Sequence, residues 1–300
     1  MPSAANWLRL DLEVTSAAVE AAAALLREIG AGGVVIEDPS APPVGFFDFD
    51  ARPQGGPTLV GAYFPMASGP AAKERLLGLL DRLSAEFGPV QLRDSLVSEA
   101  DWAERWREHY HPFRVGDLWI APPWEAPPRP GEALILDPGP AFGTGLHPTT
   151  RLCLGYLARD VKPGSAVLDL GTGSGILGLA ALKWGAAVVT ALDVDPGAVR
   201  AARENAARND LSSRFTAEVG GVEAAAGPYD LAVANIVAEV VRAALPGLYQ
   251  SLKPGGVLLA SGLLAESALD WTHELARAGF TLLGSHRLGS WVALRARRQP

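Results

Sequence analysis

The stretch AVLDLGTGSGILG, residues 166–178, decides the fold of this chain. Its first five residues form a largely apolar run as long as one buried parallel strand. Gly171, Gly173 and Gly175 follow, and the chain then resumes as ILGLAALKWG, a run typical of a helix. Glycine lets the backbone turn sharply and lie against a ligand without an intervening Cβ, and a helix N-terminus offers free N–H groups. The stretch therefore predicts a strand, a ligand-binding glycine loop and a helix.

An acidic residue follows this unit at the spacing that suits ribose binding. The run VVTALDVD (188–195) predicts the next strand, and Asp193 lies at its end, 22 residues after Gly171. A carboxylate there can accept hydrogen bonds from ribose hydroxyls. The glycines fit two registers, G-x-G-x-G from Gly171 or the dinucleotide pattern G-x-G-x-x-G from Gly173 to Gly178. The register alone does not name the nucleotide, and a glycine-rich turn that binds nothing is the minority interpretation.

The overall composition bounds the class of protein. With 300 residues, 48% of them hydrophobic, the chain has material for one large or two ordinary domains. The net charge of −7 argues against a protein that binds nucleic-acid phosphates. A single cysteine, Cys153, excludes an internal disulfide and suits a reducing cytosol. The N-terminus lacks a signal-peptide pattern and AAVEAAAALL is too short to span a bilayer, so we expect a cytoplasmic protein without membrane contact.

Residues 1–97 predict a small α+β domain. Leucine and valine alternate with charged residues over 8–14, which is the pattern of a half-buried strand. A helix after Ser16, strands over 33–37 and 58–64, a helix from Pro70 to Gly88 and a strand over 90–97 follow, and a loop rich in Pro and Gly occupies 38–57. The order β-α-β-β-α-β is that of a ferredoxin-like domain.

Residues 98–112 predict a helix that links this domain to the rest of the chain. Trp102, Trp106 and Tyr110 recur every four residues and therefore share one helical face. Such an aromatic face suits packing against a neighbouring domain, and the helix then helps to set the angle between the two domains.

The stretch DPGPAFGTGLHPTTRLCLGYLARD (137–160) follows several predicted strands and Pro-rich turns. Pro148 can occupy the first turn of a helix that runs to about Arg159. Before it, PGPAFGTGLH lacks apolar periodicity and predicts a loop, in which Gly145 and two earlier glycines allow close bends. A loop of such specific composition beside a nucleotide strand is more often a ligand contact than a plain surface turn.

Strands and helices alternate from residue 166 onward, which predicts a doubly wound parallel sheet. The last part, FTLLGSHRLGSWVALRARR (280–298), predicts two strands joined at Leu288-Gly289. The chain is therefore expected to be an α/β protein with a Rossmann-like sheet and a terminal antiparallel hairpin over 113–300, preceded by the small α+β domain.

Five segments resemble in turn the signature segments of the PrmA family of class I S-adenosylmethionine-dependent methyltransferases, which methylates ribosomal protein L11. They are DPGPAFGTGLHPTTRLCL, VLDLGTGSGILGLAALKWGA, ALDVDPGAVRAARENAARN, DLAVANIVAEVV and PGGVLLASGLL. AFGTG-x-HPTT is the most specific of these patterns, because most methyltransferases share GTGSG. The W-x-x-x-W helix and the N-terminal domain also match the family's plan, whereas the loop 38–57 matches least. The family usually has NILA where this chain has NIVA, beginning at Asn235.

The resemblance implies a set of cofactor contacts. They are Phe142, Thr144, Thr150, Gly171, Gly173, Asp193 and Asn235. Phe142 and Thr144 lie in the loop expected to close over the methionine part, and Asp193 is expected to hold the ribose. Asn235 stands where related amine methyltransferases place an Asn or Asp that faces the acceptor nitrogen, which makes it the candidate catalytic residue. The alternative for Asn235 is a buried polar residue that caps the next helix.

The resemblance also implies the reaction, which is methyl transfer to lysine side-chain and N-terminal amines of L11. A neutral nitrogen must attack the sulfonium methyl, and a lysine amine with a pKa near 10.4 is mostly charged at pH 7. The oxygen of Asn235 can accept a hydrogen bond from the amine, and His147 or bulk water can take the proton. No metal is expected, because His109 and His111 lack further ligands at metal spacing. We expect a monomer that acts on L11 free or before assembly, without nucleic acid.

Three other functions stay open at this point. One is a small-molecule or glutamine-directed methyltransferase, although the glutamine enzymes usually show N-P-P-Y where this chain has N-I-V-A. The second is a nicotinamide oxidoreductase that uses the glycines over 173–178. The third is a nucleotide-sensing module without chemistry.

Overall fold

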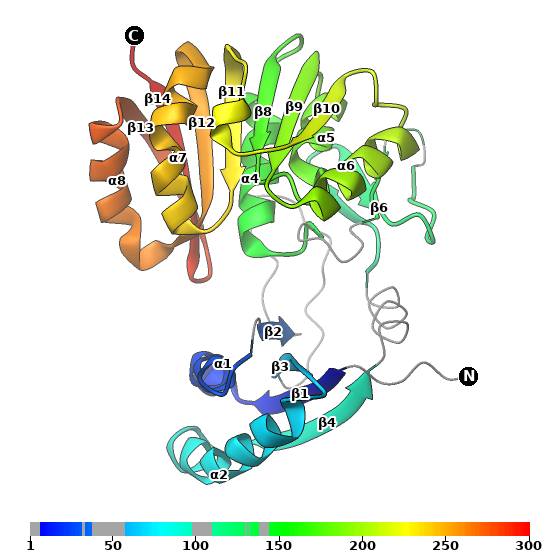
Figure 1. The fold of residues 1–300 in the computed structure, drawn as a ribbon, viewed down its shortest axis with the longest axis vertical. Coiled ribbons are helices and arrows are strands. Elements are labelled where there is room, and N and C mark those ends of the chain that lie inside the picture. Colours follow the sequence, from blue (N-terminus) through cyan, green and yellow to red (C-terminus); the bar gives the residue numbers. More distant parts are fainter. Residues whose placement is uncertain are drawn as a thin grey trace. The chain divides into compact units, whose positions relative to one another are not determined.

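The structure of the protein is a computed structural model, and it describes residues 7–31, 34–37, 58–97, 110–129, 131, 133–137 and 144–300. Contacts among these residues gather in two compact units, one within residues 7–110 and one within residues 111–300 (Figure 1). Most of the predicted linker, with Trp102, Trp106 and His109, lies outside the described residues. The structure has no helix at residues 110–112. His111 precedes Pro112, and a residue that precedes proline is biased away from the α conformation. The predicted helix therefore does not reach Pro112.

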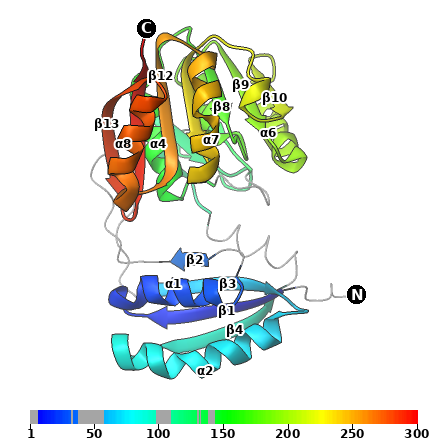
Figure 2. The same ribbon diagram turned by 60° about the vertical axis from the view of Figure 1, so that its left-hand side comes forward.

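The first unit is an antiparallel sheet with helices on one face. Its elements, in chain order, are β1 (Trp7–Val14), α1 (Val19–Glu28), β2 (Val34–Glu37), β3 (Thr58–Pro65), α2 (Gly69–Phe87) and β4 (Gln91–Val97). The strands lie in the order β2-β3-β1-β4. Alternate residues of β1, from Leu8 to Val14, are buried in one cluster with side chains of both helices, so α1 and α2 cover the same face (Figure 2). The predicted succession of strands and helices is present.

The second unit is built on a seven-stranded sheet in the order β10-β9-β8-β11-β12-β14-β13 (Figure 1). Neighbours from β10 to β12 pair in parallel, and β14 pairs antiparallel with both β12 and β13. The predicted parallel sheet with a terminal hairpin is confirmed. The elements are β8 (Ala166–Leu170), α5 (Ile176–Lys183), β9 (Val188–Asp193), α6 (Pro196–Arg208), β10 (Phe215–Val219), β11 (Tyr229–Asn235), α7 (Ala238–Ser251), β12 (Leu252–Leu264), α8 (Ala268–Arg277), β13 (Phe280–Leu288) and β14 (Trp291–Arg298).

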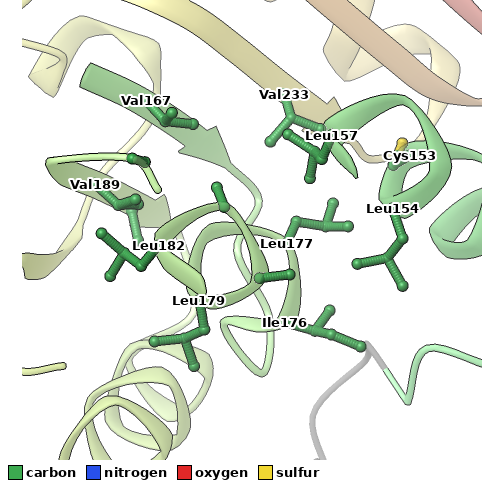
Figure 3. Close-up of a cluster of buried hydrophobic side chains, with 14 of the residues drawn as sticks. Cys153, Leu154, Leu157, Val167, Ile176, Leu177, Leu179, Leu182, Val189 and Val233 are labelled. Atoms are coloured by element: carbon green, nitrogen blue, oxygen red, sulfur yellow. The ribbon is translucent and has the colours of Figure 1, made fainter. Parts of the chain in front are cut away.

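Each face of this sheet buries its own hydrophobic cluster. Successive residues of a strand point to opposite faces, so Val167 joins one cluster and Leu168 the other. The first cluster contains side chains of α4 (Pro148–Asp160), α5 and α6, and Figure 3 shows part of it. The second contains side chains of α7 and α8. The glycine loop between β8 and α5 is thereby held at the carboxyl edge of a sheet packed on both faces.

A small sheet precedes the large one in the chain. It consists of β5 (Phe113–Val115), β6 (Leu118–Ala121) and β7 (Ala133–Ile135), in that order. β5 and β6 form an antiparallel hairpin, and β7 pairs parallel with β6. Val115, Ile120 and Leu134 are buried in the same cluster as α4 and α5. The small sheet is therefore part of the second unit's core.

Candidate active site

A cavity of about 670 Å³ lies at the carboxyl ends of β8, β9 and β11. In parallel sheets ligands bind at this edge, next to the point where the strand order reverses, and β8 and β11 are the neighbours at that point. The lining comes from the glycine loop, the end of β9, the turn after β10, the start of α7 and the segment before α4. The volume lies within the range of small-molecule sites, ~300–1,000 Å³.

The glycine loop follows β8 with an unusual backbone. Gly171, Gly173 and Gly175 have φ values of 73°, 54° and 86°, a region that residues with a Cβ rarely adopt. A Cβ on Gly171 would also lie 2.0 Å from Cγ2 of Ile236. Gly171 and Gly173 both line the cavity. The alternating glycines are thus required by backbone conformation and, at Gly171, by a neighbouring side chain.

Asp169 supports this loop from within the sheet. Its carboxylate is fully buried and accepts hydrogen bonds from Thr172 Oγ1 at 2.7 Å and from the Gly178 N–H at 3.0 Å, both on Oδ2. Its other oxygen, Oδ1, has no hydrogen-bond partner in the part of the chain that the structure describes. Burial raises the pKa of Asp169 to about 6 despite the two hydrogen bonds. Asp169 therefore shapes the loop and does not line the cavity.

Asp193 joins the glycine loop to the end of β9. Its Oδ2 accepts the N–H of Gly173 at 2.9 Å, and its Oδ1 accepts the N–H of Asp195 at 3.0 Å. The carboxylate lines the cavity. Each carboxylate oxygen can accept more than one hydrogen bond, so acceptor capacity is left for a ligand.

Asn235 is the last residue of β11, which pairs with β8 on the side away from β9. It is half-buried and lines the cavity, and its Nδ2 donates to Thr150 Oγ1 at 3.2 Å. In this orientation Oδ1 is left as an acceptor. The alternative in which Asn235 caps the next helix is wrong, because the N-cap of α7 is Val237 and no side chain caps it. Thr150 itself is buried behind Asn235, and its neighbour Thr149 lines the cavity.

His147 and Trp291 form an aromatic part of the cavity wall. Their rings meet edge to face with centroids 5.0 Å apart. His147 is the N-cap of α4, where its Nδ1 accepts the Thr149 N–H. A backbone N–H can only donate, so the proton of the neutral ring is on Nε2. Burial lowers the pKa of His147, which favours this neutral form.

The segment before α4 is only partly described. Phe142 lies outside the described residues, and so do the two glycines at 139 and 143. Thr144 accepts the Leu146 N–H on Oγ1 at 3.2 Å and does not line the cavity. Gly145 has a φ of 83°, and a Cβ there would lie 2.4 Å from Phe113 Cζ and 2.7 Å from Ile176 Cδ1. The predicted close bend at Gly145 is confirmed.

Some cavity residues were not among those predicted from the sequence. They are Val194, Gly220, Gly221, Val222, Glu223, Val237, Val240, Gly262 and Trp291. Gly262, with a φ of 85°, could have been noticed as a glycine late in a buried strand, and its missing Cβ would lie 1.9 Å from the Ile236 carbonyl oxygen. Trp291 had no local signal, because it reaches the cavity through the pairing of β14 with Leu264 of β12.

Among the described residues, no cluster of three or more His, Cys, Asp or Glu could hold a metal ion. No described helix is long and apolar enough to cross a membrane.

The seven-stranded sheet, its terminal hairpin and the cavity at its carboxyl edge define a class I methyltransferase fold. A crystal structure of a ribosomal protein L11 methylase from Lactobacillus delbrueckii subsp. bulgaricus matches with a TM-score of 0.59 and 34% sequence identity, covering 64% of this chain and 100% of that chain. Ribosomal protein L11 methyltransferases of Bacillus cereus and Bacillus anthracis are each 37% identical in an alignment of 310 positions, which covers 97% of this chain and 99% of theirs.

The family model described as Ribosomal protein L11 methyltransferase (PrmA) matches residues 6–299. The chain belongs to this family.

Proposed function

We propose that the protein transfers methyl groups from S-adenosylmethionine to amines of ribosomal protein L11, namely lysine side chains and the N-terminal amine. Membership of the family and the names of the relatives support the substrate. The observation that carries the chemistry is Asn235, whose acceptor oxygen is in the wall of a cavity that also contains Asp193. We further propose that the enzyme is a cytoplasmic monomer that acts on free or unassembled L11.

The cavity residues fit S-adenosylmethionine. Asp193 retains acceptor capacity for the two ribose hydroxyls. Val194 and Val222 provide apolar surface suited to an adenine ring. Gly171 and Gly173 give the backbone room to approach the remainder of the molecule. When bound, this cofactor supplies an electrophilic methyl group on a sulfonium. The predicted contacts of Phe142, Thr144 and Thr150 remain part of the proposal.

The protein must make the acceptor amine neutral and orient it. Deprotonating a lysine of pKa ~10.4 at pH 7 costs about 4–5 kcal/mol. A largely apolar cavity disfavours the ammonium form, and Asn235 Oδ1 can accept a hydrogen bond from the neutral amine, which points its lone pair away from Asn235. His147 is unsuited as the base, since its Nδ1 serves the helix cap. We therefore assign the proton to water and most of the rate to alignment.

We propose that residues 1–97 form a ferredoxin-like domain that recognises the substrate, with 98–112 as the linker and 113–300 as the methyltransferase domain. The first unit has its own hydrophobic cluster and an antiparallel sheet in the order β2-β3-β1-β4. Residues 1–97 contain seven basic and twelve acidic side chains, a net charge of −5 that suits a lysine-bearing partner.

The first experiment tests cofactor and chemistry. Titration calorimetry of the full chain with S-adenosylmethionine, its demethylated product and NAD should give binding of the first two only. Mass spectrometry of purified L11 incubated with enzyme and S-adenosylmethionine should show added methyl groups on amines. Asn235→Ala should lower kcat roughly 5- to 150-fold, the equivalent of ~1–3 kcal/mol. Binding of NAD without S-adenosylmethionine, or unmodified L11, would end the proposal.

The second experiment tests the role of the small domain. A chain that starts near residue 99 retains both clusters of the large sheet, so it should still bind S-adenosylmethionine. It should lose methylation of L11. Undiminished methylation by this shortened chain would show that residues 1–97 do not recognise the substrate.

A further inference from the structure

Asn205 of α6 and Asn209, the residue that caps the C-terminus of α6, pair with the open edge of β7 and of the residues that follow it. One edge of β7 is bonded to β6, where the Leu136 N–H donates to the Ala121 carbonyl at 2.8 Å. On the other edge, the Ile135 N–H donates to Asn209 Oδ1 at 2.8 Å, and Asn209 Nδ2 donates back to the Ile135 carbonyl at 2.6 Å. Asn205 pairs in the same way with Asp137, at 2.9 Å and 2.8 Å. The two amides thus satisfy four backbone groups that a neighbouring strand would otherwise bind.

The pairing works because a helix and a strand share a repeat distance. Residues four apart on a helix rise ~6 Å along its axis, and alternate residues of a strand are ~6.6 Å apart. Asn205 and Asn209 therefore meet Ile135 and Asp137 in register. An asparagine amide carries both a donor and an acceptor, as a peptide group does. Neither residue could be replaced by a side chain that only accepts or only donates without losing half of these bonds.

Asn205 makes two contacts that Asn209 does not. Its Nδ2 also donates to the carbonyl oxygen of Ser174 at 2.9 Å. Ser174 belongs to the glycine loop and is fully buried, and Asn205 is fully buried as well. Asn205 Oδ1 additionally accepts from Arg208 Nη1 at 2.6 Å. The side chain of Asn205 therefore ties the glycine loop to β7, while that of Asn209 ties only α6 to β7.

We infer that Asn205 is a positioning residue for the cofactor: it holds the glycine loop in its binding conformation through the Ser174 carbonyl. The loop has three glycines at positive φ, and glycine carries a large backbone entropy that external bonds must offset. Without the bond from Asn205, the loop loses a hydrogen bond at Ser174, the residue that follows Gly173. The N–H of Gly173 must stay on Asp193 for that carboxylate to face the cavity correctly. The inference rests on the proposed function in that the ligand is S-adenosylmethionine.

Asn209 offers a matched control for the test. Asn205→Ala and Asn209→Ala each remove one amide that pairs with β7, but only the first removes a bond to the loop. Hydrogen exchange of the full chain without ligand should be faster over residues 170–178 in Asn205→Ala and unchanged there in Asn209→Ala. Titration with S-adenosylmethionine should show affinity reduced roughly tenfold in Asn205→Ala, about 1.4 kcal/mol, and reduced less than about twofold in Asn209→Ala. In kinetics, KM for S-adenosylmethionine should rise in Asn205→Ala with kcat nearly unchanged.

A second variant tests the donor itself. Asn205→Asp keeps an acceptor for the Asp137 N–H and Arg208, but it loses the donor to the Ser174 and Asp137 carbonyls and puts an oxygen against both. It should repeat the faster exchange over 170–178. Equal effects of the Asn205 and Asn209 changes on loop exchange and affinity would overturn the inference, as would normal exchange in both Asn205 variants. Failure of the wild type to bind S-adenosylmethionine would instead contradict the proposed function, because the exchange comparison needs no ligand.

Discussion

The amide nitrogen of Asn235 lies 3.2 Å from the hydroxyl of Thr150, so a buried helix residue orients a side chain in the cavity wall. Thr150→Val removes the hydroxyl and keeps the shape of the side chain. Without the hydroxyl, the amide group of Asn235 can rotate and exchange the positions of its nitrogen and oxygen. We expect kcat to fall roughly fivefold, the equivalent of ~1 kcal/mol. Thr150→Ser keeps the hydroxyl and should stay near wild type. Steady-state kinetics would contradict this if Thr150→Val and Thr150→Ser behaved alike.

A change at Asp193 should weaken S-adenosylmethionine binding, because hydrogen bonds to a charged acceptor are worth ~1.5–3 kcal/mol. Asp193→Asn also puts a donor opposite the N–H of either Gly173 or Asp195. We expect an affinity loss of roughly 10- to 150-fold by calorimetry. Asp195→Asn is the control, since it removes the same charge two residues away and keeps an acceptor for the Gly197 N–H. Similar losses in both variants would point to general electrostatics in place of a ribose contact.

The buried carboxyl of Asp169 should make stability depend on pH. Its folded pKa of about 6 lies above its ordinary value of 3.8. Between these values the folded state keeps a proton that the unfolded state has released, so stability falls as pH rises, and above about 6 the loss is constant. The total is about 3 kcal/mol. Asp169→Asn lacks this dependence and keeps an oxygen for Thr172 and Gly178.

The measurement for Asp169 is the Tm of both proteins without ligand, in buffers that span the two pKa values. The Tm of Asp169→Asn minus that of the wild type should increase with pH up to about 6 and then level off. A difference that does not change with pH would mean that the folded-state pKa of Asp169 is not raised.

Gly145→Ala should destabilise the fold by more than its backbone conformation alone explains. A Cβ there would approach Phe113 and Ile176 within 2.7 Å, in addition to the strain of a φ of 83°. Gly164→Ala is the matched control, because Gly164 has a φ of 85° and nothing within 4 Å of the added Cβ. Both should lose ~1–3 kcal/mol from strain, and Gly145→Ala a further ~1–3 kcal/mol from overpacking. Equal free energies of unfolding in urea would exclude the steric contribution.

Local patterns predicted those parts of the site that depend on neighbours in sequence. The apolar run before Gly171 and the spacing to Asp193 predicted a strand, a loop and a second strand that ends in an acidic residue. In the structure, Asp193 accepts a hydrogen bond from the N–H of Gly173. Parallel strands bring such ends to one edge of the sheet without further information. Pro148 likewise predicted the start of α4.

The remaining parts depend on contacts between distant segments. Trp291 reaches the cavity only because β14 pairs with β12, and Asn205 bonds to Asp137, just after β7, across 68 residues of sequence. Thr150 was expected as a cofactor contact. It lies behind Asn235 because the side of α4 that contains Thr150 packs against the sheet. Periodicity reports which face of a helix is buried and does not report which side chain it meets there.

The position of β14 has a consequence for synthesis of the protein. Among the strands of the large sheet it comes last in the chain, yet it lies between β12 and β13. Until it has been translated, β12 has an open edge and β13 has no partner in the sheet. The glycine loop and Asp193 can form earlier, but Trp291 cannot reach the cavity. A nascent chain therefore completes the wall of this cavity only after β14 has left the ribosome.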